Sequence, residues 1–247
     1  MNQHSKAQQK TITFRYKFTL SDGNIKEFDV ELDSETLSLT GKKKRSYPEW
    51  TRLPYHKCPN CPLSDAQHRQ CPIAANLVDL VEFFKNSISH DEVDIEITTE
   101  ARRYVKRTAL QSGISSLIGI HMVTSGCPVM DKLRPMVRTH LPFATGEETM
   151  YRVLSMYLLA QYFLYKEGQR PDWDLKNLAE IYEAIHTVNK SFCQRLSGIH
   201  IKDASLNAVA QLDNFADITS FSLEINRLDQ IKRLFHAYLD SESSKQT

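Results

Sequence analysis

The chain lacks the sequence features that would place it in a membrane or name its reaction. No stretch approaches the roughly 18 to 20 apolar residues that a membrane-spanning helix requires, and the polar start MNQHSKAQQK gives no expectation of a secretory signal. A glycine-rich phosphate loop, a GxSxG elbow and a Walker motif are also missing. We therefore expect a cytoplasmic protein without membrane association, and the sequence names no reaction.

Glycine, proline and net charge are also low. The 247 residues include 8 Gly and 9 Pro, and the formal net charge is +1. With 41% hydrophobic and 25% charged residues, the composition is that of a globular protein rather than a disordered or fibrous one. A charge so near zero gives no general attraction to nucleic acid. We expect a folded protein with no nucleic-acid partner; an unknown protein partner stays open.

Hydrophobic periodicity predicts an α+β protein. Residues 13–20 and 25–32 alternate apolar and polar side chains around SDGN, which is typical of a β-hairpin, and DEVDIEIT followed by ARRYVKRT predicts a second one. From residue 108 onward helical spacing prevails. The predicted fold is mostly helical, with the two hairpins forming a small antiparallel sheet and with a four-cysteine metal site.

The chain is predicted to be a single domain over residues 11–247, preceded by a flexible tail at 1–10. The hairpins and a cysteine-rich segment would occupy residues 11–107, and a helical body residues 108–247. Pro72 is expected at the first position of a helix, Thr145 as the N-cap of another, and a last helix near 222–239.

Cysteine is scarce but clustered, which points to a metal. Three of the five cysteines lie in HKCPNCPLSDAQHRQCPIAANL, each followed by proline, and a further Cys-Pro pair follows fifty-five residues later. A CxxC pair places two thiolates on one turn, and remote cysteines can complete fourfold sulfur coordination. The predicted ligands, called here the four cysteines, are Cys58, Cys61, Cys71 and Cys127.

The prolines favour an iron–sulfur cluster over Zn²⁺ as the cofactor. Zinc knuckles use backbone N–H groups after the second cysteine, and Pro62 has none. Cys71 and Cys127 each precede a proline that would open a helix, so that the helix dipole would favour a thiolate. Zn²⁺ and redox-active or structural thiols remain alternatives.

Other candidate chemistry is less specific. Arg134, Arg138 and His140 lie near Cys127 in sequence and are candidates for holding an anionic ligand. His56 and His68 flank the cysteine segment and are alternative metal ligands. The EAIH stretch is a single ExxH, whereas a di-iron bundle needs two, and Cys193 is interpreted as a small core residue.

The longer motifs resemble a known family. PEWTRLPYHKCPNCPL, CPIAANLVDLVEFF, TSGCPVMDKLRPMVRTHLPFATGEETMYRVLSMYLLAQYF and IYEAIHTVNKSFCQRL resemble an uncharacterised bacterial family known only as a domain of unknown function. The resemblance covers nearly the whole chain and implies that the four cysteines act together. It implies no activity or substrate.

Two functions are predicted from these features. The first is an iron–sulfur protein that senses redox state or relays electrons; the alternative is an interaction module, without catalytic activity, held together by structural Zn²⁺. A third possibility is an enzyme that uses Arg134, Arg138 and His140 with the nearby Glu147 and Glu148 beside the metal. It would need an open coordination position on the metal, which four thiolates on zinc do not leave.

Overall fold

The computed structural model describes residues 10–41, 44–224 and 228–243, without the side chains of 221–224 and 241–243. The predicted flexible tail therefore lies outside the described residues apart from Lys10. The chain forms two compact units, of which unit 1 comprises Met1–Phe143 and Thr187–Leu212, and unit 2 comprises Ala144–His186 and Asp213–Thr247.

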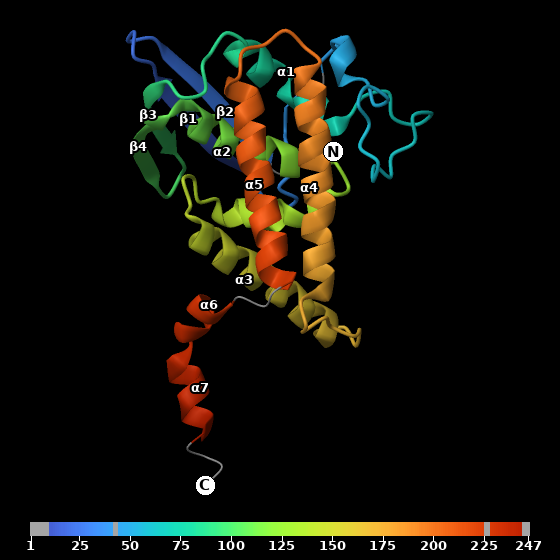
Figure 1. Ribbon diagram of the computed structural model, residues 1–247, viewed down its shortest axis with the longest axis vertical. Helices are drawn as coiled ribbons and strands as arrows, with labels where there is room; N and C mark the ends of the chain where they lie inside the picture. The colour runs from blue at the N-terminus through green and yellow to red at the C-terminus, as the bar shows by residue number, and fades with distance from the viewer. Residues whose placement is uncertain (1–9, 42–43, 225–227, 244–247) are drawn as a thin grey trace, which may run out of the picture. The chain divides into compact units, whose positions relative to one another are not determined.

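Unit 1 contains a four-stranded antiparallel sheet, with the strand order β2-β1-β3-β4 (Figure 1). The strands are β1 (Thr11–Thr19), β2 (Ile25–Asp33), β3 (Glu92–Thr98) and β4 (Arg103–Ala109). The two predicted hairpins are confirmed, and the pairing of β1 with β3 joins them into one sheet.

The alternation of side chains explains why these segments form strands. Tyr16 and Phe18 of β1 and Ile95 of β3 are fully buried on one face of the sheet. On the other face, Arg103 of β4 forms an ion pair with Glu96 of β3 at 2.6 Å. Burial of the apolar face stabilises the sheet, while exposed ion pairs of this kind contribute little.

Two helices of unit 1 pack against the buried face of the sheet. They are α1 (Pro72–Phe84), which begins at Pro72 as predicted, and α2 (Leu110–Val123). The ring of Phe84 lies 5.3 Å from that of Phe18 between centroids. Gly113 lets α2 approach closely, because a Cβ there would lie 2.5 Å from Cδ1 of Ile95. Two 3₁₀ helices, η1 (Glu49–Thr51) and η2 (Met130–Thr139), complete the regular structure preceding unit 2.

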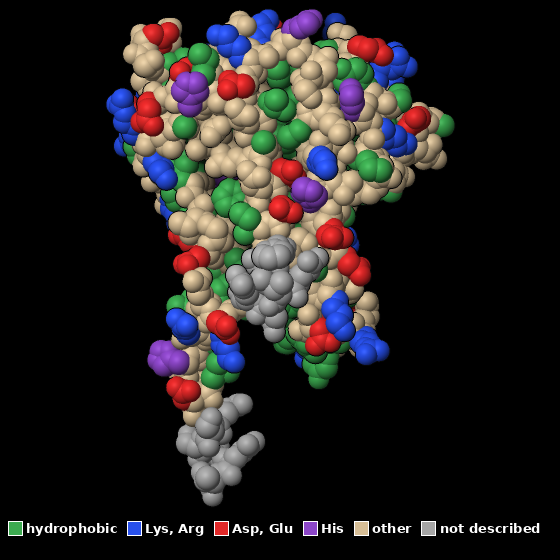
Figure 2. All heavy atoms as spheres, viewed as in Figure 1, with side chains coloured by type: hydrophobic (Ala, Val, Ile, Leu, Met, Phe, Trp, Pro, Cys, Tyr) green, Lys and Arg blue, Asp and Glu red, His purple; other side chains and the backbone are tan. Residues whose placement is uncertain are grey.

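Unit 2 is helical. It contains α3 (Gly146–Lys166), α6 (Asp229–Arg233) and α7 (His236–Ser243), while α4 (Lys176–Ser197) and α5 (Ala204–Glu224) each contribute to both units. Thr145 caps α3 as predicted, since its side chain accepts the Glu148 N–H and the Glu148 carboxylate accepts the Thr145 N–H. Large apolar side chains of this unit are exposed at the surface, where Figure 2 shows hydrophobic side chains in green.

The structure corrects the prediction in two places. The last helix was expected near 222–239, but α5 continues to Glu224, residues 225–227 lie outside the described part, and α6 and α7 follow as separate helices. The α+β class with an antiparallel sheet is what the structure shows. The four-cysteine metal site that was part of the predicted fold is wrong for the described residues.

Candidate functional site

The four cysteines lie in unit 1 in three different local settings. Cys58 and Cys61 are partly exposed in the loop between η1 and α1, where the Cys61 N–H donates to the Cys58 carbonyl at 3.0 Å and closes a turn. Cys71 is buried at the N-cap of α1. Cys127 is buried in the segment that leads from α2 to η2.

These positions do not make a metal site. Among the residues that the structure describes, no group of three or more His, Cys, Asp or Glu side chains is arranged to hold a metal ion. The physical reason is that a loop, a helix N-cap and an interhelical turn each fix their own cysteine, and the side chains do not converge on one point. The sequence spacing therefore did not fix the geometry that a metal site needs.

The thiols nevertheless affect one another's pKa. Burial raises the pKa of the Cys58 thiol from 9.0 to about 11, and the neighbouring charges of Cys71 and Cys127 add to the shift. Burial also raises the pKa of Cys71 and of Cys127. At neutral pH Cys58 is therefore protonated and reacts slowly as a nucleophile.

Backbone N–H groups oppose these shifts at the two buried cysteines. The N–H groups of Ala74 and Ile73, in the first turn of α1, lower the pKa of Cys71. Those of Met130 and Val129 do the same for Cys127. The predicted placement of Cys71 at a helix N-terminus is confirmed. The same prediction for Cys127 is wrong, because η2 begins at Met130 with Val129 as its N-cap and Pro128 lies before it.

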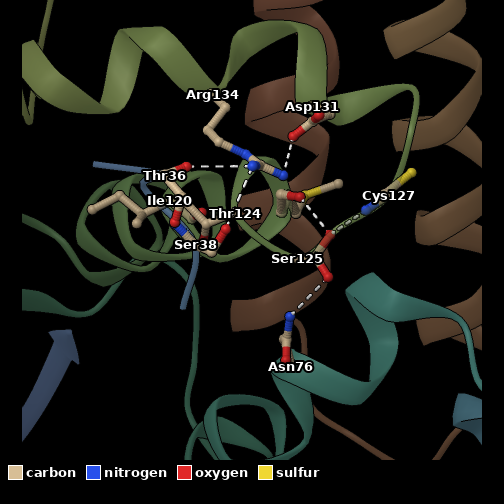
Figure 3. Close-up of polar contacts among 10 residues, drawn as sticks. Thr36, Ser38, Asn76, Ile120, Thr124, Ser125, Cys127, Asp131 and Arg134 are labelled. Atoms are coloured by element: carbon tan, nitrogen blue, oxygen red, sulfur yellow. Dashed lines mark hydrogen bonds and ion pairs between the residues drawn. The ribbon is translucent and has the colours of Figure 1, made fainter. Parts of the chain in front are cut away.

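A chain of backbone and hydroxyl contacts fixes Cys127 (Figure 3). Its N–H donates to Oγ of Ser125 at 3.1 Å, and that hydroxyl donates to the Met122 carbonyl at 2.7 Å. Nδ2 of Asn76, on α1, donates to the Ser125 carbonyl at 3.5 Å. Figure 3 shows the Cys127 sulfur pointing away from these contacts, so the sulfur itself takes no part in them.

Sequence reasoning missed Arg195, the largest fully buried side chain of the described chain. It lies near the C-terminal end of α4 and is 2% exposed. Its Nη1 donates to the carbonyls of Trp50 and Arg52 at 2.6 and 2.8 Å. Its Nη2 donates, at longer distances of 3.5 and 3.4 Å, to those of Leu53 and His56. One guanidinium thus binds four backbone carbonyls between residues 50 and 56, the segment that precedes Cys58.

The charge of Arg195 is balanced in an unusual way. Burial lowers its pKa. The groups that oppose this lowering are Cys71, Cys58, Tyr55 and Cys61, in that order, and none of these is a carboxylate. The ionisable groups that act on the pKa of this buried cation are therefore three thiols and one phenol.

Of the residues proposed to hold an anion, Arg134 has other partners. Arg134 forms an ion pair with Asp131 and donates to the Thr36 carbonyl at 3.3 Å, as Figure 3 shows. This contact anchors the loop after β2 to η2. Arg138 is exposed. The anionic ligand stays a prediction, but Arg134 is largely occupied by structural contacts.

His140 instead belongs to a part-buried polar cluster around Tyr16 of β1. Its Nε2 lies 2.7 Å from the Tyr16 hydroxyl and 3.2 Å from Oγ of Ser116, and these two hydroxyls lie 2.9 Å apart. The cluster satisfies the hydroxyl of Tyr16, which is fully buried and has a raised pKa. A structural role accounts for all three contacts.

The remaining candidates are placed as follows. The His56 carbonyl accepts from Arg195, and its backbone has a φ of 45°. His68 is half-buried in the same loop. Nδ1 of His186 lies 2.8 Å from the Asp213 carboxylate. Cys193 is partly exposed rather than a core residue.

Comparison with known proteins identifies a family and no activity. A family model described as "Domain of unknown function (DUF6901)" matches residues 12–236. No curated protein matches the chain, and no solved structure matches it. Among the described residues, no helix has the length and apolar character needed to cross a membrane.

Proposed function

Because the chain belongs to this family of unknown function, membership supplies no activity, and we propose from the geometry that it is a cytoplasmic redox-sensing or electron-relay protein. The responsive groups would be Cys58, Cys61 and Cys71. The observation that carries the proposal is a buried guanidinium whose neighbouring ionisable groups are thiols and a phenol instead of a carboxylate.

The energetics of Arg195 link the thiols to the fold. A buried charge costs several kcal/mol unless it is paired. Carbonyl dipoles offset part of this cost, and negative charge on Cys58, Cys61 or Cys71 would offset more. A change that removes these thiols therefore removes the groups whose ionised form would stabilise the guanidinium that holds the loop around residues 50–56.

Cys58 and Cys61 are the pair best placed to respond. They lie in one turn closed by a 3.0 Å backbone hydrogen bond, and residues three apart in such a turn have Cα atoms within about 7 Å, close to disulfide range. A low-molecular-weight disulfide would accept two electrons and two protons from the two thiols. The products would be one intramolecular disulfide and two small thiols.

The test is a redox titration of the full chain. The protein would be equilibrated with mixtures of reduced and oxidised glutathione, and the Cys58–Cys61 bond measured by peptide mass spectrometry. We expect this bond to form reversibly at one potential, and Cys58→Ser to abolish it. Cys193→Ser is the matched control and should leave the titration unchanged. Absence of the bond at every potential would rule out the proposed pair.

The cofactor, an iron–sulfur cluster or Zn²⁺, stays a prediction. The described thiols do not converge on a common point, so binding of either would require them to move. Metal analysis of protein purified without oxygen separates the possibilities, because a cluster gives a broad band near roughly 400 nm and Zn²⁺ gives no colour. The alternative of a zinc-held interaction module predicts that a chelator unfolds the protein.

A further inference from the structure

Helix α3 is apolar on both of its faces. The residues buried on its inner face include Met150, Val153, Leu154 and Tyr157. Its outer face carries six more large apolar side chains, which are between 39% and 60% exposed: Tyr151, Leu158, Leu159, Tyr162, Phe163 and Tyr165. A helix that is hydrophobic all round is normally buried. In the described part of the chain, the outer face of α3 is therefore less covered than its composition calls for.

The C-terminal segment extends this apolar surface. The ring of Phe235 stacks on that of Tyr151 with centroids 6.3 Å apart. Leu234, Tyr238 and Leu239, which lie near Phe235 in sequence, are also exposed. Trp173, just beyond α3, is 54% exposed. Apolar side chains drawn green in Figure 2 show at the surface near the end of α3.

The surface is close in size to one side of a stable interface. The six side chains on α3 and Phe235, which stacks on Tyr151, are each about half exposed and together offer roughly 700 Å². A specific interface buries about 800 Å² from each partner. The largest apolar patch of a typical monomer is roughly 300 to 600 Å², so the patch exceeds what a monomer usually exposes.

We propose that this surface binds a second copy of the same chain, with the two α3 helices antiparallel across a twofold axis. The charges at the two ends of α3 favour this occupant. Its first turn carries Glu147 and its last turn Lys166, and both are exposed. Antiparallel packing places Glu147 of each copy near Lys166 of the other, and it also aligns the helix dipoles favourably. A twofold axis makes one patch complementary to itself.

The dimer is tested by the mass of the full chain in solution, measured by sedimentation equilibrium over a range of concentrations. Wild type should have the mass of two chains. The double substitution Leu159→Glu with Tyr162→Glu should give the mass of one chain, because it would bury four carboxylates at the interface. Val105→Glu is the matched control. Val105 is 63% exposed on β4 and the same chemical change there should leave the dimer intact.

Cross-linking keeps the test decisive if the double variant does not fold. Leu158 lies near the middle of α3, so antiparallel pairing brings the two copies of this residue together. Mild oxidation of Leu158→Cys should link two chains through the introduced thiols, whereas Val105→Cys should not. A wild type that stays monomeric at every concentration overturns the proposal. So does a dimer that survives the double substitution, or one that is lost equally in Val105→Glu.

Discussion

Nη1 of Arg195 donates to the Trp50 carbonyl at 2.6 Å, across 145 positions of sequence. The contact joins the C-terminal part of α4 to η1, and through η1 to the loop of Cys58 and Cys61. The same nitrogen also bonds the Arg52 carbonyl at 2.8 Å. Arg195 is therefore the side chain through which the state of the cysteine segment and the stability of unit 1 are connected.

Removing the Arg195 charge should destabilise the protein strongly. Arg195→Met leaves the Trp50 and Arg52 carbonyls without their donor, and charged hydrogen bonds contribute roughly 1.5 to 3 kcal/mol each. We expect the free energy of unfolding in urea to fall by about 3 kcal/mol or more. Lys190→Met removes an exposed cation from the same helix and should change it by less than about 0.5 kcal/mol. Equal effects of the two substitutions would contradict the assigned role.

Two glycines of α2 should respond in opposite ways to alanine. A Cβ at position 113 would lie 2.5 Å from Cδ1 of Ile95 and 2.7 Å from Cε1 of Phe18, so Gly113→Ala should be destabilising. At Gly119 the nearest atom is Cδ2 of Leu212 at 3.6 Å, an ordinary contact. Gly119→Ala should therefore stabilise the helix by about 0.5 to 1 kcal/mol. Thermal unfolding of both variants tests the close packing of α2 on the sheet.

His121 should make the protein sensitive to acid. Burial lowers the pKa of this histidine from 6.5 to about 4, and its Nδ1 has no hydrogen-bond partner among the described residues. Between these values the unfolded chain binds a proton that the folded chain does not, so stability decreases as pH falls from 6.5 toward 4. We expect a loss on the order of 2 kcal/mol from this residue. In urea unfolding, the free energy of His121→Gln should lack this part of the pH dependence. A pH profile equal to that of the wild type would contradict the lowered pKa of His121.

Cys58 should make the protein sensitive to base. Its thiol has a pKa of about 11 in the fold, against an ordinary value of 9.0. Between these values the folded chain keeps a proton that the unfolded chain releases, so stability decreases as pH rises from 9 toward 11. Alkylation of Cys58 by iodoacetamide, followed by mass spectrometry, should accelerate about tenfold per pH unit over the same range. A rate that levels off near pH 9 would contradict the raised pKa.

Local patterns predicted much of the fold because they are set by neighbouring residues. Alternation around Tyr16 and Ile95 gave both hairpins, Pro72 gave the start of α1, and Thr145 with Glu148 gave the start of α3. The polar cluster of Tyr16, Ser116 and His140 could not be predicted in the same way. Tyr16 and His140 are 124 positions apart in sequence, so no local pattern indicates their contact.

The candidate site was predicted less well. Spacing indicated that the four cysteines belong together, but it carries no information on the direction in which each sulfur points, and the predicted metal geometry is wrong for the described residues. Arg195 did leave a signal. It lies three residues after Phe192 and seven after Val188, on the helical stripe that is buried, where an arginine is rarely found without a partner.

Fluorescence of Trp50 tests the central claim most directly. The chain has 2 Trp, so Trp173→Phe leaves Trp50, whose carbonyl accepts from Arg195, as the reporter. In this variant the emission of Trp50 should change as glutathione takes the cysteines from reduced to oxidised, at the potential at which the Cys58–Cys61 bond forms. The change should vanish when Cys58 and Cys61 are both replaced by serine. An emission that stays constant while mass spectrometry shows the bond forming would contradict a link between the thiols and the Arg195 network.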